Sequence, residues 1–347
     1  MIALLACSAA HAAAKCTLSK LAELPITMVG LRPSIGAKID GADAQFLLDS
    51  GAWYSMISSA TMAQFKLRES PAPFGLRVTG VGGSTSTSIA TVKVFTLAGI
   101  PIHNVEFLVG GSEVGSQLVG ILGQNFLERW DVEYDLARGV VRLFKAGGDC
   151  KHAGLAYWVG ADQSMSTMDI AYTTPQKPHA TGTAYINGTK ITAMFDTGAA
   201  TSVLTLRAAE RAGVKPDTAG VVDAGYASGI GRGTVKSYIA PFASFKIGDN
   251  EEIKNTRLRI ADMDLDEGAM LIGADFFLSH HVLISNSQHR VYFTYNGGPV
   301  FNLSRSAATG ATTSATDTAA AAPHDDELTD AAAYARRGVA FAGRRDF

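Results

Sequence analysis

The chain has 347 residues, of which 47% are hydrophobic, 18% are charged and 36 are glycine, and its formal net charge is −2. That length suffices for about two or three units, each with its own core. So much apolar sequence excludes disorder over most of the chain, and the near-neutral charge argues against nucleic acid as a ligand.

Residues 1–14 are almost wholly small or apolar, and Ala10-His11-Ala12 has the small-x-small form that signal peptidase accepts. The run is too short to cross a membrane as a helix. We therefore predict the trailing part of a signal peptide and export to the periplasm or cell envelope. A lipoprotein cleavage box at Leu4-Leu5-Ala6-Cys7 and an irregular N-terminal arm are the alternatives.

Removal of that segment would leave two of the three cysteines, Cys16 and Cys150. An even pair in an exported protein predicts a disulfide. Its loop of 134 residues would contribute about 4–5 kcal/mol in the chain-entropy model. In a cytosolic protein the same residues would be unpaired buried thiols, so the two interpretations depend on the compartment.

Residues 17–150 have the pattern of a lobe built mostly of strands. Asp40-Gly41 lies between alternating runs and predicts a tight hairpin turn. Residues 91–97 and 138–144 alternate as half-buried strands do. The lobe also contains three landmarks: an apolar run ending in Asp-Ser-Gly-Ala, a glycine-rich stretch and an apolar-apolar-Gly segment. They are Phe46 to Ala52, the stretch with Gly80, Gly82 and Gly83, and Ile121-Leu122-Gly123.

Residues 153–304 repeat these landmarks in the same order, at offsets of 147 to 150 positions. They are the turn Asn187-Gly188, the run Ala193 to Ala199 with Asp196-Thr197-Gly198, the stretch with Gly229, Gly231 and Gly233, and Leu271-Ile272-Gly273. The clearest helix is 206–212, with Thr205 as its N-cap and Gly213 just past its end. The preserved order and spacing predict a duplicated, mostly β lobe.

The composition changes after the second lobe. Residues 305–328 are rich in alanine, threonine and serine, which predicts a flexible linker. In 329–347, Tyr334, Gly338 and Phe341 fall on helical spacing. This segment resembles the first helix of a tetratricopeptide repeat, a unit of about 34 residues, so it would be a partial repeat offering a surface to a protein partner. An isolated amphipathic helix is the alternative.

A single Asp-Ser/Thr-Gly is a common turn, but two copies in matching places, each followed by the other two landmarks, indicate shared chemistry. On these residues the chain resembles retropepsin-like and pepsin-like aspartic peptidases, of the bilobal, bacterial type, over residues 25–150 and 165–300. Ala52 and Ala199 resemble the retroviral form of the motif, as do glycine-rich hairpins in both lobes.

The resemblance implies that Asp49 and Asp196 form the catalytic pair. The residues that would support the two turns are Ser50, Gly51, Thr197 and Gly198. The strands ending at Gly123 and Gly273 would pack beside these turns. The flaps would contain Gly80, Gly82, Gly83, Gly229, Gly231 and Gly233.

Two carboxylates about 3 Å apart cannot both ionise easily, so they share one proton and titrate in coupled steps. The ionised member would take a proton from water as that water attacks a peptide carbonyl, and the protonated member would donate to the oxyanion. This mechanism requires no metal and no cofactor. Glycine-rich flaps would exclude water and pair with an extended polypeptide substrate.

Other interpretations of single motifs are weaker. The Gly229-x-Gly231-x-Gly233 pattern is followed by 234–239, a strand pattern, whereas a dinucleotide loop requires a helix there. His280-His281 has no further ligand at metal spacing, so we expect a structural or surface role. Trp53 and Tyr54 read as core residues, with one side of a cleft as the alternative.

The sequence leaves one alternative function, a non-catalytic peptide-binding module of the same fold. It also leaves two ways of pairing the lobes. Each could pair with another chain, as in retroviral dimers, but duplication favours a monomer with intramolecular pairing because the second lobe is always nearby.

Overall fold

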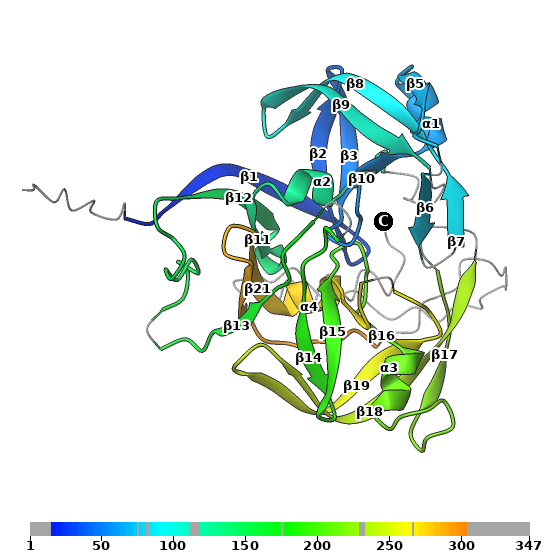
Figure 1. The fold of residues 1–347 in the computed structure, drawn as a ribbon, viewed down its shortest axis with the longest axis vertical. Coiled ribbons are helices and arrows are strands. Elements are labelled where there is room, and N and C mark those ends of the chain that lie inside the picture. Colours follow the sequence, from blue (N-terminus) through cyan, green and yellow to red (C-terminus); the bar gives the residue numbers. More distant parts are fainter. Residues whose placement is uncertain are drawn as a thin grey trace, which may run out of the picture.

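The computed structural model describes residues 15–303, except 75, 81–82, 111–117, 161, 175–176, 229–232 and 266. These residues form two lobes, placed one above the other in Figure 1 and joined by a sheet to which both contribute. Among them, no helix is long and apolar enough to cross a membrane. The predicted signal remnant 1–14, linker 305–328 and tail helix 329–347 lie outside the described residues.

The first lobe is a sheet with the strand order β2-β3-β10-β4-β9-β8-β5, which β2 closes by pairing with β8 as well. Its elements are β2 (Arg32–Ile39), β3 (Ala42–Leu48), β4 (Met56–Ile57), α1 (Ser59–Gln64), β5 (Arg68–Pro71), β6 (Arg77–Gly80), β7 (Gly83–Ser86), β8 (Ser88–Leu97), β9 (Ile100–Val109), β10 (Gly120–Leu122) and α2 (Gln124–Leu127). Phe46, Phe95 and Phe107 fill its centre, with ring centroids 5.5 to 5.6 Å apart. The closed sheet thus surrounds an aromatic core.

The second lobe repeats this order strand for strand, as β14-β15-β20-β16-β19-β18-β17, and β14 closes it by pairing with β18. Its elements are β14 (Thr181–Ile186), β15 (Thr189–Phe195), β16 (Val203–Thr205), α3 (Leu206–Arg211), β17 (Val222–Ser228), β18 (Thr234–Ile247), β19 (Glu251–Ala261), β20 (Met270–Ile272) and α4 (Ala274–Ser279). The shared topology confirms the predicted duplication and the mostly β fold.

The local predictions hold with small shifts. Both hairpin turns have positive φ at their two central residues. The values are 48° and 91° at Asp40-Gly41 and 47° and 76° at Asn187-Gly188. Helix α3 is capped by Thr205, whose Oγ1 accepts the Ala208 N–H at 3.2 Å, and it ends at 211 rather than 212. The strand predicted at 138–144 begins later, because residue 138 belongs to the 3₁₀ turn η1 (Leu136–Arg138) and Gly139 is left-handed at φ 73°.

A six-stranded antiparallel sheet, not foreseen from the sequence, joins the lobes. Its strands are β1 (Thr17–Val29), β12 (Val140–Gly147) and β11 (Asp131–Asp135) from the first lobe, then β21 (His280–Ser285), β22 (Arg290–Tyr295) and β13 (Ser166–Asp169) from the second. The lobes meet where β11 pairs with β21, with Val132 opposite Ile284 and Tyr134 opposite Val282. Backbone hydrogen bonds therefore fix one lobe against the other within a single chain. The lobe limits 17–150 and 153–304 remain predictions.

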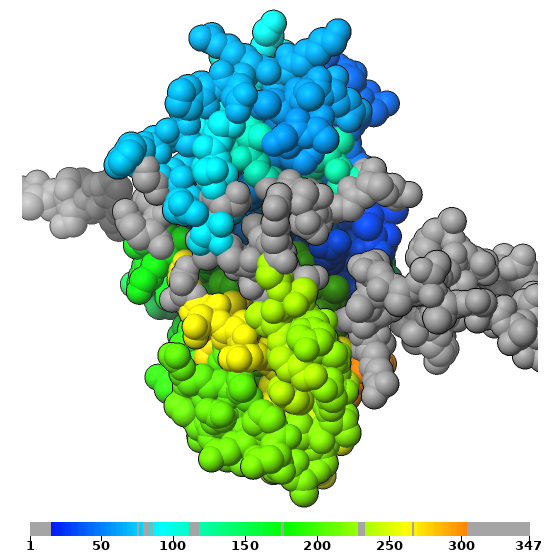
Figure 2. All heavy atoms as spheres, turned by 90° about the vertical axis from the view of Figure 1, so that its right-hand side faces the viewer, coloured from blue at the N-terminus to red at the C-terminus, as the bar shows by residue number. Residues whose placement is uncertain are grey.

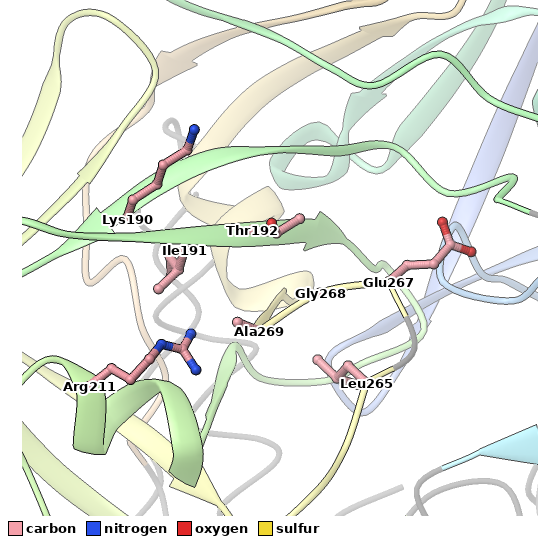
Figure 3. Close-up of a pocket in the computed structure, with 8 residues that line it drawn as sticks. All are labelled: Lys190, Ile191, Thr192, Arg211, Leu265, Glu267, Gly268 and Ala269. Carbon is pink, nitrogen blue, oxygen red and sulfur yellow. The ribbon is translucent and has the colours of Figure 1, made fainter.

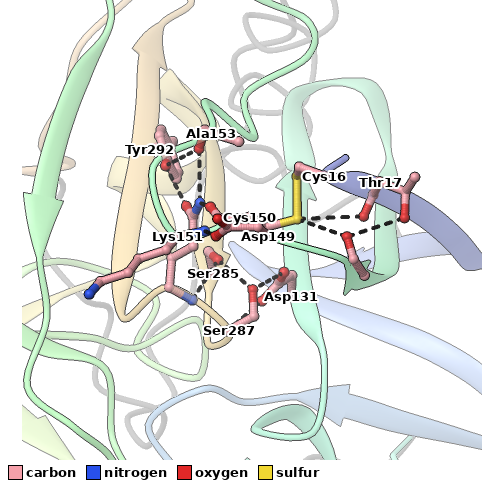
Figure 4. Close-up of a disulfide and its surroundings, with 12 residues drawn as sticks. Cys16, Thr17, Asp131, Asp149, Cys150, Lys151, Ala153, Ser285, Ser287 and Tyr292 are labelled. Atoms are coloured by element: carbon pink, nitrogen blue, oxygen red, sulfur yellow. Dashed lines mark hydrogen bonds between the residues drawn. A yellow bond between two sulfur atoms is a disulfide. The ribbon is translucent and has the colours of Figure 1, made fainter. Parts of the chain in front are cut away.

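A disulfide ties the start of this sheet to the segment that leads into the second lobe. Cys16 and Cys150 are bonded, with their Cα atoms 4.6 Å apart (Figure 4). Cys150 packs with Leu283 and Tyr292 of the second lobe, and the Gln288 amide donates to its carbonyl oxygen. The cross-link thus packs against β21 and β22 of the sheet that holds the lobes together.

Candidate active site

Each Asp-Ser/Thr-Gly turn begins where a central strand ends. β3 leads into Asp49, whose N–H donates to Leu122 O at 3.0 Å, and β15 leads into Asp196, whose N–H donates to Ile272 O at 2.9 Å. The acceptors belong to β10 and β20, which run parallel to β3 and β15. The two apolar-apolar-Gly segments therefore lie beside the turns, where the resemblance placed them.

The glycine that ends each segment is required by close backbone contact. A Cβ on Gly123 would lie 2.7 Å from Ala52 O, and a Cβ on Gly273 would lie 2.5 Å from the Thr201 carbonyl carbon. Both distances are too short for any side chain. Each apolar-apolar-Gly segment can thus approach its turn only because it ends in glycine.

Ser50 and Thr197 join the two turns through four reciprocal hydrogen bonds. Ser50 Oγ accepts the Thr197 N–H at 3.0 Å and donates to Phe195 O at 2.9 Å. Thr197 Oγ1 accepts the Ser50 N–H at 3.0 Å and donates to Leu48 O at 2.7 Å. Both side chains are fully buried, so the turns of the two lobes are held in fixed register.

This register places each carboxyl group over the opposite turn. A Cβ on Gly51 would lie 2.2 Å from Asp196 Cγ, and a Cβ on Gly198 would lie 2.2 Å from Asp49 Cγ. The glycine N–H groups bind the carboxylates of their own turns, Gly51 to Asp49 Oδ1 and Gly198 to Asp196 Oδ1, both at 2.9 Å. Glycine therefore both donates to one carboxylate and leaves room for the other.

The two carboxyl groups differ in their electrostatic surroundings. Burial raises the pKa of Asp49 well above its ordinary value, and the charge of Asp196 and a hydrogen bond with it raise it further. Burial also raises the pKa of Asp196, but the N–H groups of Ala199 and Gly198, the bond with Asp49 and the charge of His179 oppose that rise. Two coupled acids in this arrangement titrate as a pair rather than independently.

A second layer of polar contacts supports each turn and was missed from the sequence. In the first lobe Asn125 Oδ1 accepts from the N–H and the hydroxyl of Ser55, both at 2.8 Å. In the second lobe Asp275 Oδ1 accepts from the N–H and the hydroxyl of Ser202, at 2.8 and 2.7 Å. Each serine hydroxyl in turn accepts the N–H of the glycine that ends the apolar-apolar-Gly segment. Their matching offsets of 147 and 150 positions were the signal that could have revealed them.

The predicted flap residues are only partly within the described chain. Gly80 and Gly83 pair across the β6–β7 hairpin, and Gly233 lies just before β18. Gly82, Gly229 and Gly231 lie outside the described residues. Figure 1 shows β6, β7 and β17 on the same side of the molecule, and Figure 2 views that side, with the first lobe in blue and cyan above and the second in green and yellow below.

Each lobe has a pocket. Trp53 and Tyr54 line one of about 220 Å³ in the first lobe, with Leu76 and Phe107. Trp53 is 43% exposed, so its interpretation as a core residue is wrong and the alternative, one wall of a cleft, fits better. The other pocket, of about 370 Å³, lies in the second lobe between β15, α3 and the loop before β20 (Figure 3).

The adjacent histidines His280 and His281 are structural. His280 is fully buried and bonds Glu251 at 2.9 Å, while His281 bonds Glu133 at 3.0 Å across the joint between the lobes. Glu133, Asp135 and His281 could place ligand atoms within 4.8 Å of one another. Arg142, however, forms ion pairs with both carboxylates, so a guanidinium already supplies the positive charge that a metal ion would bring.

Comparisons with known proteins match an aspartyl protease family in each lobe. Residues 35–126 match the family model described as "Aspartyl protease", and residues 182–279 match the one described as "gag-polyprotein putative aspartyl protease". Comparison with curated proteins returns no match. Among solved structures the chain is similar to a retropepsin-like aspartic protease from Rickettsia conorii, at 17% identity, with 39% of this chain and 97% of that chain covered and a TM-score of 0.26. The fold is thus mostly β, with two retropepsin-like lobes that each match an aspartyl protease family.

Proposed function

We propose that the chain is an aspartic endopeptidase that hydrolyses peptide bonds in polypeptides, with Asp49 and Asp196 as its catalytic pair. The observation that carries the proposal is the reciprocal approach of the two carboxyl groups, each so close to the opposite glycine that a Cβ there would lie 2.2 Å from its Cγ. A purely structural pair of turns has no need to bring two buried acids together, because that arrangement costs free energy.

In the proposed mechanism Asp196 begins ionised and Asp49 protonated. Asp196 takes a proton from water as the water oxygen attacks the carbonyl carbon, and Asp49 gives its proton to the carbonyl oxygen. A tetrahedral diol results. Asp196 then protonates the leaving nitrogen while Asp49 recovers a proton from a diol hydroxyl, the C–N bond breaks, and the pair returns to its starting state.

The pocket beside Trp53 supports a preference within this function. Its lining is mainly apolar, with Leu76, Ile89 and Phe107. Burial of an apolar substrate side chain there would contribute about 1.5–3 kcal/mol to binding. We therefore expect cleavage next to large apolar residues.

The direct test measures cleavage of a reduced, denatured protein between pH 3 and 7 by the wild type, Asp49→Asn and Asp196→Asn. Asp43→Asn is the matched control, since the side chain of Asp43 is 90% exposed. We expect activity in the wild type and the control alone. Wild-type activity in either active-site variant would refute the assignment.

The non-catalytic peptide-binding module is the other outcome of this test. It would be indicated by tight binding of a peptide without turnover at any pH. Pairing of β11 with β21 inside one chain supports a monomeric peptidase, which sedimentation would check. The Cys16–Cys150 disulfide supports export to the periplasm or cell envelope, because disulfides persist mainly in oxidising compartments. Cell fractionation tests that part of the proposal.

A further inference from the structure

The second lobe holds an ionisable pair that the proposed mechanism does not use. His179 Nδ1 lies 2.7 Å from Glu267 Oε1, and the two side chains are 13% and 12% exposed. His179 precedes β14, and Glu267 lies in the loop before β20, where it also lines the 370 Å³ pocket (Figure 3). The pair is thus largely buried and is built from two separate segments.

Both segments lead directly to Asp196. The residue after His179, Ala180, accepts the N–H of Phe195 at 3.1 Å, next to Asp196 in the chain. The loop that contains Glu267 continues into β20, whose Ile272 O accepts the Asp196 N–H at 2.9 Å. Backbone hydrogen bonds therefore hold the segments that contain His179 and Glu267 beside the backbone at Asp196.

Glu267 is the anchor of the imidazole. Nε2 of His179 is buried and has no hydrogen-bond partner among the described residues, so Nδ1 makes the ring's polar contact. Imidazoles are protonated in the acidic range where paired aspartates act. The charge of His179 is among the causes that oppose the rise in the pKa of Asp196, and Glu267 holds the ring through Nδ1.

The duplicated lobe offers a comparison for this position. His179 lies 17 residues before Asp196, and the residue 17 before Asp49 is Arg32. Arginine is charged at any working pH. Each lobe thus carries a basic residue at the same place before its aspartate, an arginine in the first lobe and a histidine in the second.

We propose that His179, held by Glu267, is a positioning residue that stabilises the ionised carboxylate of Asp196 and so directs the shared proton to Asp49. This inference rests on the proposed function. The titratable groups that act on Asp196 are Asp49 from the opposite turn and His179, beside the N–H groups of Gly198 and Ala199 that donate to its carboxylate. Tyr134, on β11, is buried. Burial and then the charge of Asp49 raise the pKa of its hydroxyl, so it stays neutral.

The test compares the wild type with His179→Gln, His179→Arg and Glu267→Gln, and uses the exposed His103 in His103→Gln as the control. One readout is the pH profile of kcat/KM on a fluorogenic peptide. The other is a ¹³C NMR titration of labelled aspartate carboxyls, with Asp196→Asn for assignment. The titration does not require turnover, so it reports on His179 even if the peptidase proposal fails.

We expect His179→Gln to move the acidic limb of the profile and the lower apparent pKa of the pair upward by about half a unit or more. A neighbouring cation typically shifts the pKa of a carboxyl by about one to three units, and the negative charge of Glu267 offsets part of that shift. His179→Arg should restore the wild-type value, and Glu267→Gln should lower it. Equal values in His179→Gln and His103→Gln would overturn the proposal. A shift in His179→Arg as large as that in His179→Gln would also overturn it, because it would indicate an effect of packing. An upward shift of the apparent pKa in Glu267→Gln would overturn it too, and this outcome can be measured even if His179→Gln does not fold.

Discussion

The reciprocal bonds between the turns predict a large cost for a small change, Ser50→Ala. The hydroxyl that is lost accepts the Thr197 N–H at 3.0 Å and donates to Phe195 O at 2.9 Å, in a fully buried position. The substitution removes a single oxygen and leaves one N–H and one C=O without this partner in a buried place. An unsatisfied buried polar group costs about 1–3 kcal/mol, so with two such groups we expect a loss of roughly 2–6 kcal/mol in the free energy of unfolding.

Urea unfolding followed by tryptophan fluorescence measures that loss, and Ser19→Ala, exposed on β1, is the control. A second variant, Thr197→Val, removes the hydroxyl that accepts the Ser50 N–H. Because the two side chains share one network, the double variant should lose less than the sum of the single variants, by about 1 kcal/mol or more. Additive losses, or a Ser50→Ala cost no larger than that of the control, would refute the reasoning.

Three further predictions concern the two turns and the disulfide. Gly51→Ala should lower kcat by about 100-fold or more with little change in circular dichroism, because its Cβ would displace the Asp196 carboxyl and misplacement by about 1 Å can cost that much; unchanged kcat would contradict this. Burial and the charge of Asp196 raise the pKa of Asp49 in the folded state, so its stabilising contribution is present at low pH and is lost as pH rises through that pKa. Asp49→Asn should therefore melt at a higher temperature than the wild type at pH 7 but not at pH 3, and a lower melting temperature at pH 7 would count against it. Cys16→Ser should lose up to roughly 4–5 kcal/mol of stability, and two free thiols at Cys16 and Cys150 in the denatured, unreduced mature protein would show that the disulfide does not form.

Local motifs and their repetition were sufficient to predict the two lobes and the turns that face each other. The Asp-Gly and Asn-Gly turns need positive φ, and both have it. The apolar-apolar-Gly segments had to lie against a backbone, and the contacts at Gly123 and Gly273 show why. In each case one short stretch of sequence contains the whole physical requirement, so reading it requires no knowledge of distant partners.

The sheet between the lobes could not be predicted in this way. Its central pair joins strands about 150 residues apart, and alternation along a strand does not specify its neighbour. The position of Glu133 was equally unpredictable, because charged residues are usually exposed. Here Glu133 is fully buried and bonded to His281 and Tyr157. Those partners come from remote parts of the chain, so the sequence pattern contains no sign of them.

Duplication within one chain also permits something that a symmetric dimer cannot have. In a dimer of identical lobes every substitution occurs twice, and the two aspartates stay equivalent until substrate binds. Here Gln124 donates to Ser50 O at 2.6 Å in the first lobe, whereas the matching residue of the second lobe is Ala274.

The residue that accepts from the serine in the second layer of contacts also differs between the lobes. Asn125 carries an amide, whereas its counterpart Asp275 carries a carboxyl group whose pKa is raised by burial. These differences, with the charge of His179 that acts on Asp196, give the two aspartates unequal surroundings. Under the proposed function, such unequal surroundings would let the protein itself assign donor and acceptor, without help from the substrate.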